Sequence, residues 1–199
     1  MSTPAAPTPA PTPAPTPAAP TPGQTVGPFF HDALPFPRDR ELVPPGSPGS
    51  VVLRGRVLDG AGEPVPDALV ELWQTAPDGT VVQQPGSLRR DGVTFTGWGR
   101  CATDGEGRWS FVTLRPGTPY VALTLLARGL LDRLQTRAYL PDAPDDDLLA
   151  ALGPRAATLR CTDDEHGLLI DLRLQGEHET VFLDHAARPG GPLGDGGTH

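Results

Sequence analysis

Residues 51–74 read VVLRGRVLDGAGEPVPDALVELWQ, and the two ends of this stretch decide the fold. In the first part, the apolar residues Val51, Leu53 and Val57 alternate with two arginines. Successive side chains of a β-strand point to opposite faces, so this alternation predicts a strand with an apolar inner face and a charged outer face. The last part, residues 68–74, reads ALVELWQ and predicts a second strand.

Short segments of the same kind continue along the chain, at residues 107–114, 120–127, 134–140, 156–162, 168–174 and 180–184. Tight-turn dipeptides separate several of the predicted strands, namely Asp59-Gly60, Asp78-Gly79, Asp91-Gly92 and Asp104-Gly105. Many short strands at this spacing predict an all-β sandwich. One stretch, residues 146–153, predicts a short helix that begins at an aspartate cap and ends at a Gly-Pro pair.

Composition divides the 199 residues into three parts. Residues 1–20 repeat proline, alanine and threonine, which favours extended polyproline II and offers no apolar face, so we expect a disordered tail. A role of this tail as an SH3-like ligand or spacer stays an alternative. Residues 21–185 hold the predicted strands and form one domain, in which the proline-rich region 30–50 is expected to be irregular. Residues 186–199 form a flexible, glycine-rich tail.

The net charge and the absence of long apolar runs argue against nucleic acid and membranes as partners and against secretion. A formal charge of -8 argues against nucleic acid and anionic membranes. No apolar run approaches the ~20 residues that span a bilayer, and no basic patch precedes an apolar core as in a secretory signal. We therefore expect a cytoplasmic protein. Cys101 and Cys161 suit this compartment as free buried thiols, and a disulfide between them stays open.

The polar residues form no self-contained catalytic set. No two of the five histidines share an HxH, HxxH or HExxH spacing: His31, His166, His178, His185 and His199. The acidic run 145–147 suits a helix start, because the DxDxDG spacing of a calcium loop is absent. No nucleophile elbow, phosphate loop or dinucleotide motif is present. The residues alone therefore predict a β-sandwich with no metal site and no catalytic residues of its own.

Four stretches, in this order, resemble the intradiol ring-cleavage dioxygenases. They are TPGQTVGPFFH (21–31), the segments 55–79 and 97–117 around VELWQ and GRCATDG, LTLLARGLLDRLQTRAYLPD (123–142) and LIDLRLQGEHETVFLDH (169–185). The first is similar to the family's opening TPSQTxGPY, and the last to the closing IRLQGExETVFFD of its alpha-type chains. The resemblance covers Thr21 to His185 and implies the family's β-sandwich.

The family has iron-bearing beta-type chains and alpha-type chains. In the beta type, two tyrosines and two histidines hold Fe(III), and the histidines lie as H-x-H on one strand. Tyr120 and Ala122 stand at these histidine positions, and Tyr139 matches a strand residue that is not a ligand. The first ligand tyrosine would fall near Ser87. The resemblance therefore implies an alpha-type chain that binds no iron itself and pairs with an iron-bearing beta subunit.

The resemblance also implies an activity, which is intradiol cleavage of protocatechuate by O₂ to 3-carboxy-cis,cis-muconate in a hetero-oligomer of alpha–beta pairs. Another substituted catechol stays an alternative substrate. By position in the family's motifs, Thr25, Gly27, Pro28 and Arg128 would complete the substrate pocket of the beta chain. Phe29 stands where the family commonly has tyrosine, so one phenol hydroxyl is missing. A transthyretin-like binding or scaffold module without enzymatic role is the alternative from another class.

Overall fold

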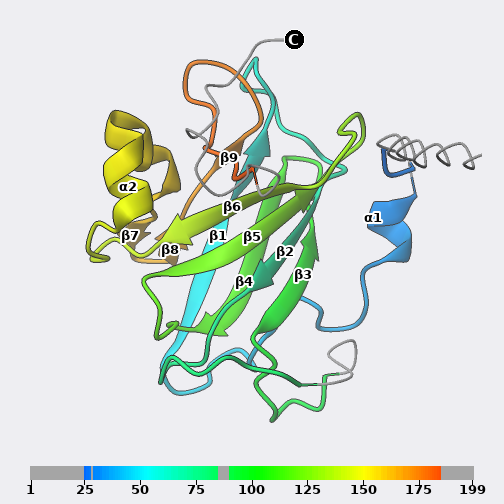
Figure 1. Cartoon of the computed structure of the whole chain (residues 1–199). Helices are drawn as coiled ribbons and strands as arrows, with labels where there is room; N and C mark the ends of the chain where they lie inside the picture. The colour runs from blue at the N-terminus through cyan, green and yellow to red at the C-terminus, as the bar shows by residue number, and fades with distance from the viewer. Residues whose placement is uncertain (1–24, 28, 85–89, 185–199) are drawn as a thin grey trace, which may run out of the picture.

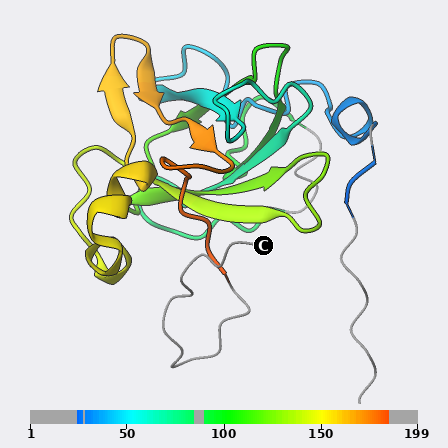
Figure 2. The same cartoon turned by 90° about the horizontal axis from the view of Figure 1, so that it is seen from above.

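Two β-sheets packed face to face form the body of the protein (Figures 1 and 2). The structure, a computed structural model, describes residues 25–27, 29–84 and 90–184. Within these residues one sheet has five strands and the other has four, so the prediction of an all-β sandwich is confirmed. The predicted tails, 1–20 and 186–199, lie outside the described residues, and the domain boundaries stay predictions.

The five-stranded sheet is built around the long strand β1 (Ser50–Leu58). Along one edge β1 pairs antiparallel with β4 (Arg108–Leu114). Along the other edge it pairs in parallel with two short strands, β8 (Gly167–Leu169) and β9 (Leu172–Arg173). The antiparallel strand β7 (Thr162–Asp164) then extends the sheet beyond β8.

The four-stranded sheet is antiparallel throughout and has the order β3-β2-β5-β6. Its strands are β3 (Trp98–Ala102), β2 (Leu69–Trp73), β5 (Tyr120–Leu126) and β6 (Leu134–Tyr139). Residues 127–133 connect β5 to β6; this connection is called here the β5–β6 turn and carries Arg128.

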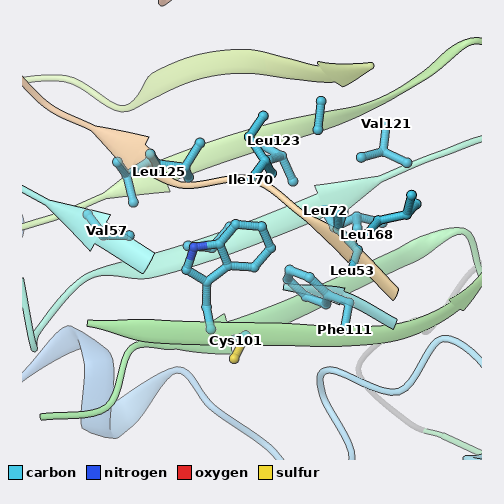
Figure 3. Close-up of a cluster of buried hydrophobic side chains, with 14 of the residues drawn as sticks. Leu53, Val57, Leu72, Cys101, Phe111, Val121, Leu123, Leu125, Leu168 and Ile170 are labelled. Atoms are coloured by element: carbon cyan, nitrogen blue, oxygen red, sulfur yellow. The ribbon is translucent and has the colours of Figure 1, made fainter. Parts of the chain in front are cut away.

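The hydrophobic core lies between the sheets, where the labelled side chains of Figure 3 gather. Leu53 and Val57 of β1 point inward, as their alternation predicts, and are at most 2% exposed. From the other sheet Leu72, Leu123 and Leu125 point toward them. Burial of each such side chain stabilises the fold by about 1.5–3 kcal/mol relative to an exposed position.

Aspartate side chains shape the turns that the Asp-Gly dipeptides predict. In each turn, Oδ1 of the aspartate accepts hydrogen bonds at 2.7–2.9 Å from backbone N–H groups two to four residues further on, and the aspartates are Asp59, Asp78, Asp91 and Asp104. The hydroxyl and N–H of Thr94 lower the pKa of Asp91 to about 2, because both bonds favour the ionised carboxylate. The predicted turn positions are therefore confirmed.

The predicted helix is present as α2 (Asp147–Leu152), and Asp146 caps it by accepting the N–H of Leu149 at 3.0 Å. A 3₁₀ helix, η1 (Gly153–Leu159), follows directly. The prediction of a strand at 156–162 was therefore wrong for most of its length. A proline in the first turn favours a helical start, and Leu159 packs against Leu149 in a second apolar cluster.

Three further segments differ from the prediction. Strand β3 was not predicted, and the region expected to be irregular contains the four-residue helix α1 (Phe30–Ala33). Residues 180–184 form no strand. The predicted strand 168–174 is broken into β8 and β9. Between them, Oδ1 of Asp171 accepts a hydrogen bond from the backbone N–H of Arg56 at 2.9 Å, and this side-chain bond interrupts the backbone pairing with β1. Among the described residues, no helix has the length and apolar character needed to traverse a bilayer.

Candidate functional site

The N-terminal arm, defined here as residues 25–39 without Pro28, meets the β5–β6 turn. Oγ1 of Thr25 accepts a hydrogen bond from the N–H of Gly129 at 3.1 Å. Because Arg128 precedes Gly129, this contact brings two of the predicted site residues to one place. Gly27 follows on the arm, and its carbonyl accepts the N–H of Phe30 at 3.4 Å. Pro28 lies outside the described residues.

Arg128 forms an ion pair with Asp67, which comes from the loop before β2. The side chain of Arg128 is 61% exposed, whereas that of Asp67 is only 13% exposed. No hydrogen bond of ordinary geometry joins the pair. The charge of Arg128 is thus balanced within this chain, while much of its guanidinium remains open to a ligand or a partner.

A shallow depression of about 210 Å³ adjoins this contact. It is lined by Val26 of the arm and by residues of the β5–β6 turn and its borders, namely Leu126, Ala127, Leu130, Leu131, Asp132 and Arg133. Leu131 is 65% exposed, and on the arm Phe29 is 74% exposed. Exposed apolar side chains around an open depression are typical of a surface that another molecule covers.

The positions of the family's histidine ligands lie on the outer face of the four-stranded sheet. Ala122 stands opposite Arg137 in the register of β5 and β6, and the guanidinium of Arg137 lies 4.1 Å from the ring centroid of Tyr120. The same guanidinium donates to Oη of Tyr139 at 2.9 Å, and Tyr139 donates to Asp146 at 2.6 Å.

Burial and the bond to the Asp146 carboxylate raise the pKa of Tyr139 to about 12, so its phenol stays neutral. Ferric iron prefers anionic oxygen ligands. Alanine offers no ligand atom, and the guanidinium of Arg137 adds a fixed positive charge. Of the two histidine positions that the resemblance places at 120 and 122, position 122 therefore offers no side-chain ligand atom. Ser87, near which the first ligand tyrosine would fall, lies outside the described residues.

The remaining ionisable residues are scattered. Among the described residues, no group of three or more His, Cys, Asp or Glu side chains is placed to hold a metal ion. His31 lies beside Asp32 and His166 beside Glu165, far apart in the sequence, whereas His185 and His199 fall outside the described residues. Cys101 and Cys161 are free and buried, so the disulfide left open by the sequence is not formed.

A larger depression, about 610 Å³, lies elsewhere, on the outer face of the five-stranded sheet. Four arginines line it: Arg40, Arg54, Arg56 and Arg108. Arg54 is paired with Asp164, and Arg108 with Asp104 and Glu106, so neighbouring carboxylates balance the charge of two of the four arginines. Neither Thr25 nor Arg128 borders this groove.

Two residues that matter at the candidate site were missed in the sequence. Asp67 balances the charge of Arg128 from 61 positions away in the sequence, and Arg137 lies opposite Ala122 on the neighbouring strand. Neither belongs to a recognisable motif, because each acts through strand pairing or loop packing that only the fold creates.

Residues 26–143 match the family described as Dioxygenase. The arm from Val26 onward, strands β1 and β4, the whole four-stranded sheet and the β5–β6 turn lie within this match, and the chain belongs to the intradiol dioxygenase family. It is 34% identical over 196 residues to the protocatechuate 3,4-dioxygenase alpha chain of Pseudomonas putida, a match that covers 82% of this chain and 96% of that relative. The alpha chain of Burkholderia cepacia is 31% identical with the same coverage.

The beta chain of the Burkholderia cepacia enzyme is 33% identical over 136 residues, covering 61% of this chain and 56% of that relative. Among solved structures, the dioxygenase domain of a dioxygenase–carbohydrate-binding fusion protein from Streptomyces sp. SirexAA-E superposes with a TM-score of 0.53 at 24% identity. That match covers 79% of this chain and 99% of the other, and it agrees with the sandwich fold.

Proposed function

We propose that this chain is the alpha-type subunit of a protocatechuate 3,4-dioxygenase. In the proposed assembly a beta subunit holds Fe(III), and this chain lends Thr25, Gly27, Pro28 and Arg128 to the pocket that binds protocatechuate for intradiol cleavage by O₂. The iron supplies the activation of substrate and O₂, and this chain contributes binding and shape. We place the assembly in the cytoplasm, where buried free thiols are stable.

The observation that carries the proposal is the contact between Thr25 and Gly129 at 3.1 Å. It joins the arm to the β5–β6 turn, so a hydroxyl, a flexible glycine and an arginine converge at one end of the sandwich. A guanidinium suits a ring carboxylate, because its planar donors can bind both carboxylate oxygens. A depression with exposed apolar side chains adjoins them, as expected where a partner subunit would close the pocket.

The choice of the alpha type rests on two further observations. The match to the alpha chains covers 96% of their length, whereas the match to the beta chain covers 56% of that chain. In addition, Tyr120 and Ala122 stand where the resemblance places the family's two histidine ligands, and the cation of Arg137 lies beside both.

Iron analysis of this chain purified alone and together with a co-expressed beta-type chain tests the proposal. Alone, the chain should be colourless and contain no stoichiometric iron; the assembly should copurify, contain iron and cleave protocatechuate. One tightly bound ferric ion per isolated chain, with a visible phenolate-to-iron band, would overturn the assignment. A clean monomer that does not bind the beta chain in size-exclusion runs would favour the transthyretin-like scaffold.

A further inference from the structure

The N-terminal arm is held by little apolar packing. Helix α1 has no buried residue, and Figures 1 and 2 show that it stands outside the two sheets. At its two ends Phe29 is 74% exposed and Leu34 is 40% exposed. A segment with so little buried apolar surface opens easily, so polar contacts must determine its position.

Arg100 on strand β3 supplies such a contact. Its Nη1 donates to the carbonyl of Leu34 at 3.0 Å, at the end of α1. Its Nε and Nη2 both donate to Oε1 of Glu71, at 3.0 and 2.6 Å. Glu71 lies directly opposite Arg100 in the pairing of β2 with β3. Because the guanidinium is planar, fixing two of its donors on the sheet also aims the third at the arm.

Aromatic contacts complete the anchor on β3. The guanidinium carbon of Arg100 lies 5.1 Å from the ring centroid of Trp98, and Phe36 of the arm stacks on the same ring at 6.1 Å with an interplanar angle of 7°. Arg90 donates to the carbonyls of Asp39 and Trp98 at 3.1 and 2.6 Å. The far end of the arm is therefore attached to β3, and Arg100 provides the contact nearest to the proposed site.

A chain of backbone hydrogen bonds leads from Arg100 to the candidate site. Leu34 accepts from Arg100, and its own N–H donates to the carbonyl of Phe30 at 3.0 Å. The N–H of Phe30 in turn donates to the carbonyl of Gly27 at 3.4 Å. A displacement of Leu34 would consequently shift Gly27, and with it Thr25, relative to the β5–β6 turn.

We propose that Arg100, oriented by Glu71, is a positioning residue that fixes the N-terminal arm against Arg128. The link to substrate binding rests on the proposed function; the anchoring of the arm does not. Lysine cannot replace Arg100, because a single ammonium lacks the planar fork that reaches Glu71 and Leu34 together.

Limited chymotrypsin digestion of the full chain measures the anchoring, with cleavage after Phe29 and Phe30 followed by mass spectrometry. Arg100→Lys and Glu71→Gln should each accelerate this cleavage by roughly ten- to a hundredfold, the range expected for loss of a charge-assisted hydrogen bond. Arg115→Ala is the matched control, because it removes an exposed arginine–carboxylate pair far from the arm in the sequence. Cleavage is compared well below the melting temperature of each variant, so that global unfolding does not contribute.

Kinetics of the assembled enzyme then separate the two proposals. Arg100→Lys should raise KM for protocatechuate about tenfold, with a much smaller change in kcat, because a misplaced arm weakens binding. If Arg100→Lys and Glu71→Gln are both cleaved at the rate of the unmodified chain, the positioning role is overturned. If cleavage accelerates while KM stays constant, the positioning role stands and the arm's part in the proposed function is refuted.

Discussion

Replacing Arg128 by alanine tests the proposed site most directly. A charge-assisted hydrogen bond to a carboxylate is worth about 1.5–3 kcal/mol, and about 1.4 kcal/mol corresponds to a factor of ten. If Arg128 binds the ring carboxylate, kcat/KM of the assembled enzyme for protocatechuate should fall by roughly ten- to a hundredfold. Catechol has no ring carboxylate, so its turnover should change far less.

The ion pair between Arg128 and Asp67 suggests a second variant, in which kcat/KM for protocatechuate should not fall. While the pair is intact, a substrate carboxylate must compete with the carboxylate of Asp67. Asp67→Asn removes this competitor at nearly constant volume, so kcat/KM for protocatechuate should stay level or rise. Because Arg128 is 61% exposed, solvent screens its side of the pair, and Asp67→Asn, which keeps a polar side chain, should unfold at a nearly unchanged urea concentration.

The assay is steady-state oxygen uptake by the alpha–beta assembly with protocatechuate and with catechol, at one fixed ionic strength. Comparing the two substrates separates loss of carboxylate binding from a general disturbance of the interface. An equal fall for both substrates in Arg128→Ala would show that the reasoning fails. If kcat/KM for protocatechuate falls as much in Asp67→Asn as in Arg128→Ala, then the ion pair, and not the free guanidinium, matters for activity.

Three other predictions concern stability and the tail. Burial raises the pKa of Tyr139 to about 12, above the value near ~10 of an unfolded tyrosine. The contribution of the neutral phenol to the free energy of unfolding is therefore complete below pH ~10 and is lost as the pH rises toward ~12. In urea unfolding, Tyr139→Phe should remove this alkaline loss. Gly55→Ala should lower the unfolding free energy by about 1–3 kcal/mol or prevent folding, because the added Cβ would lie 1.7 Å from the carbonyl oxygen of Ile170, as calorimetry of the soluble fraction can check. Deleting residues 2–19 should leave activity and melting temperature unchanged, whereas a deletion through Pro28 should lower activity; equal effects of the two deletions would contradict the predicted boundary near Thr21.

The sequence predicts most of the sheets, because their two-residue periodicity reports burial directly. The inward Leu53 and Val57 and the aspartate turns lie where expected. Prediction fails where side chains pack on something other than a sheet face. Residues 156–159 pack apolar side chains against α2 instead of a sheet face. Strand β3 does not show the alternation of apolar and polar residues that marks a half-exposed strand, because the arm covers Trp98 and Arg100 on its outer side.

The candidate site is only partly readable from the sequence. The resemblance singled out Thr25 and Arg128, and the fold brings them to the same turn although 103 positions separate them. The side chains that hold these two in place, Asp67 and Arg100, carry no motif. Their roles depend on partner residues on other strands and loops. These residues come into contact only when the whole sandwich forms.

The guanidinium of Arg137 beside Tyr120 and Ala122 also bears on how this lineage can evolve. Restoring two histidines at positions 120 and 122 would place them next to a permanent positive charge, which repels a ferric ion. Removing Arg137 first would leave Asp146 and the hydroxyl of Tyr139 without their cationic neighbour at the start of α2. Each single substitution toward such a metal site therefore lowers stability or gains nothing. If the chain works beside an iron-bearing partner, as proposed, single substitutions would not easily remove that dependence.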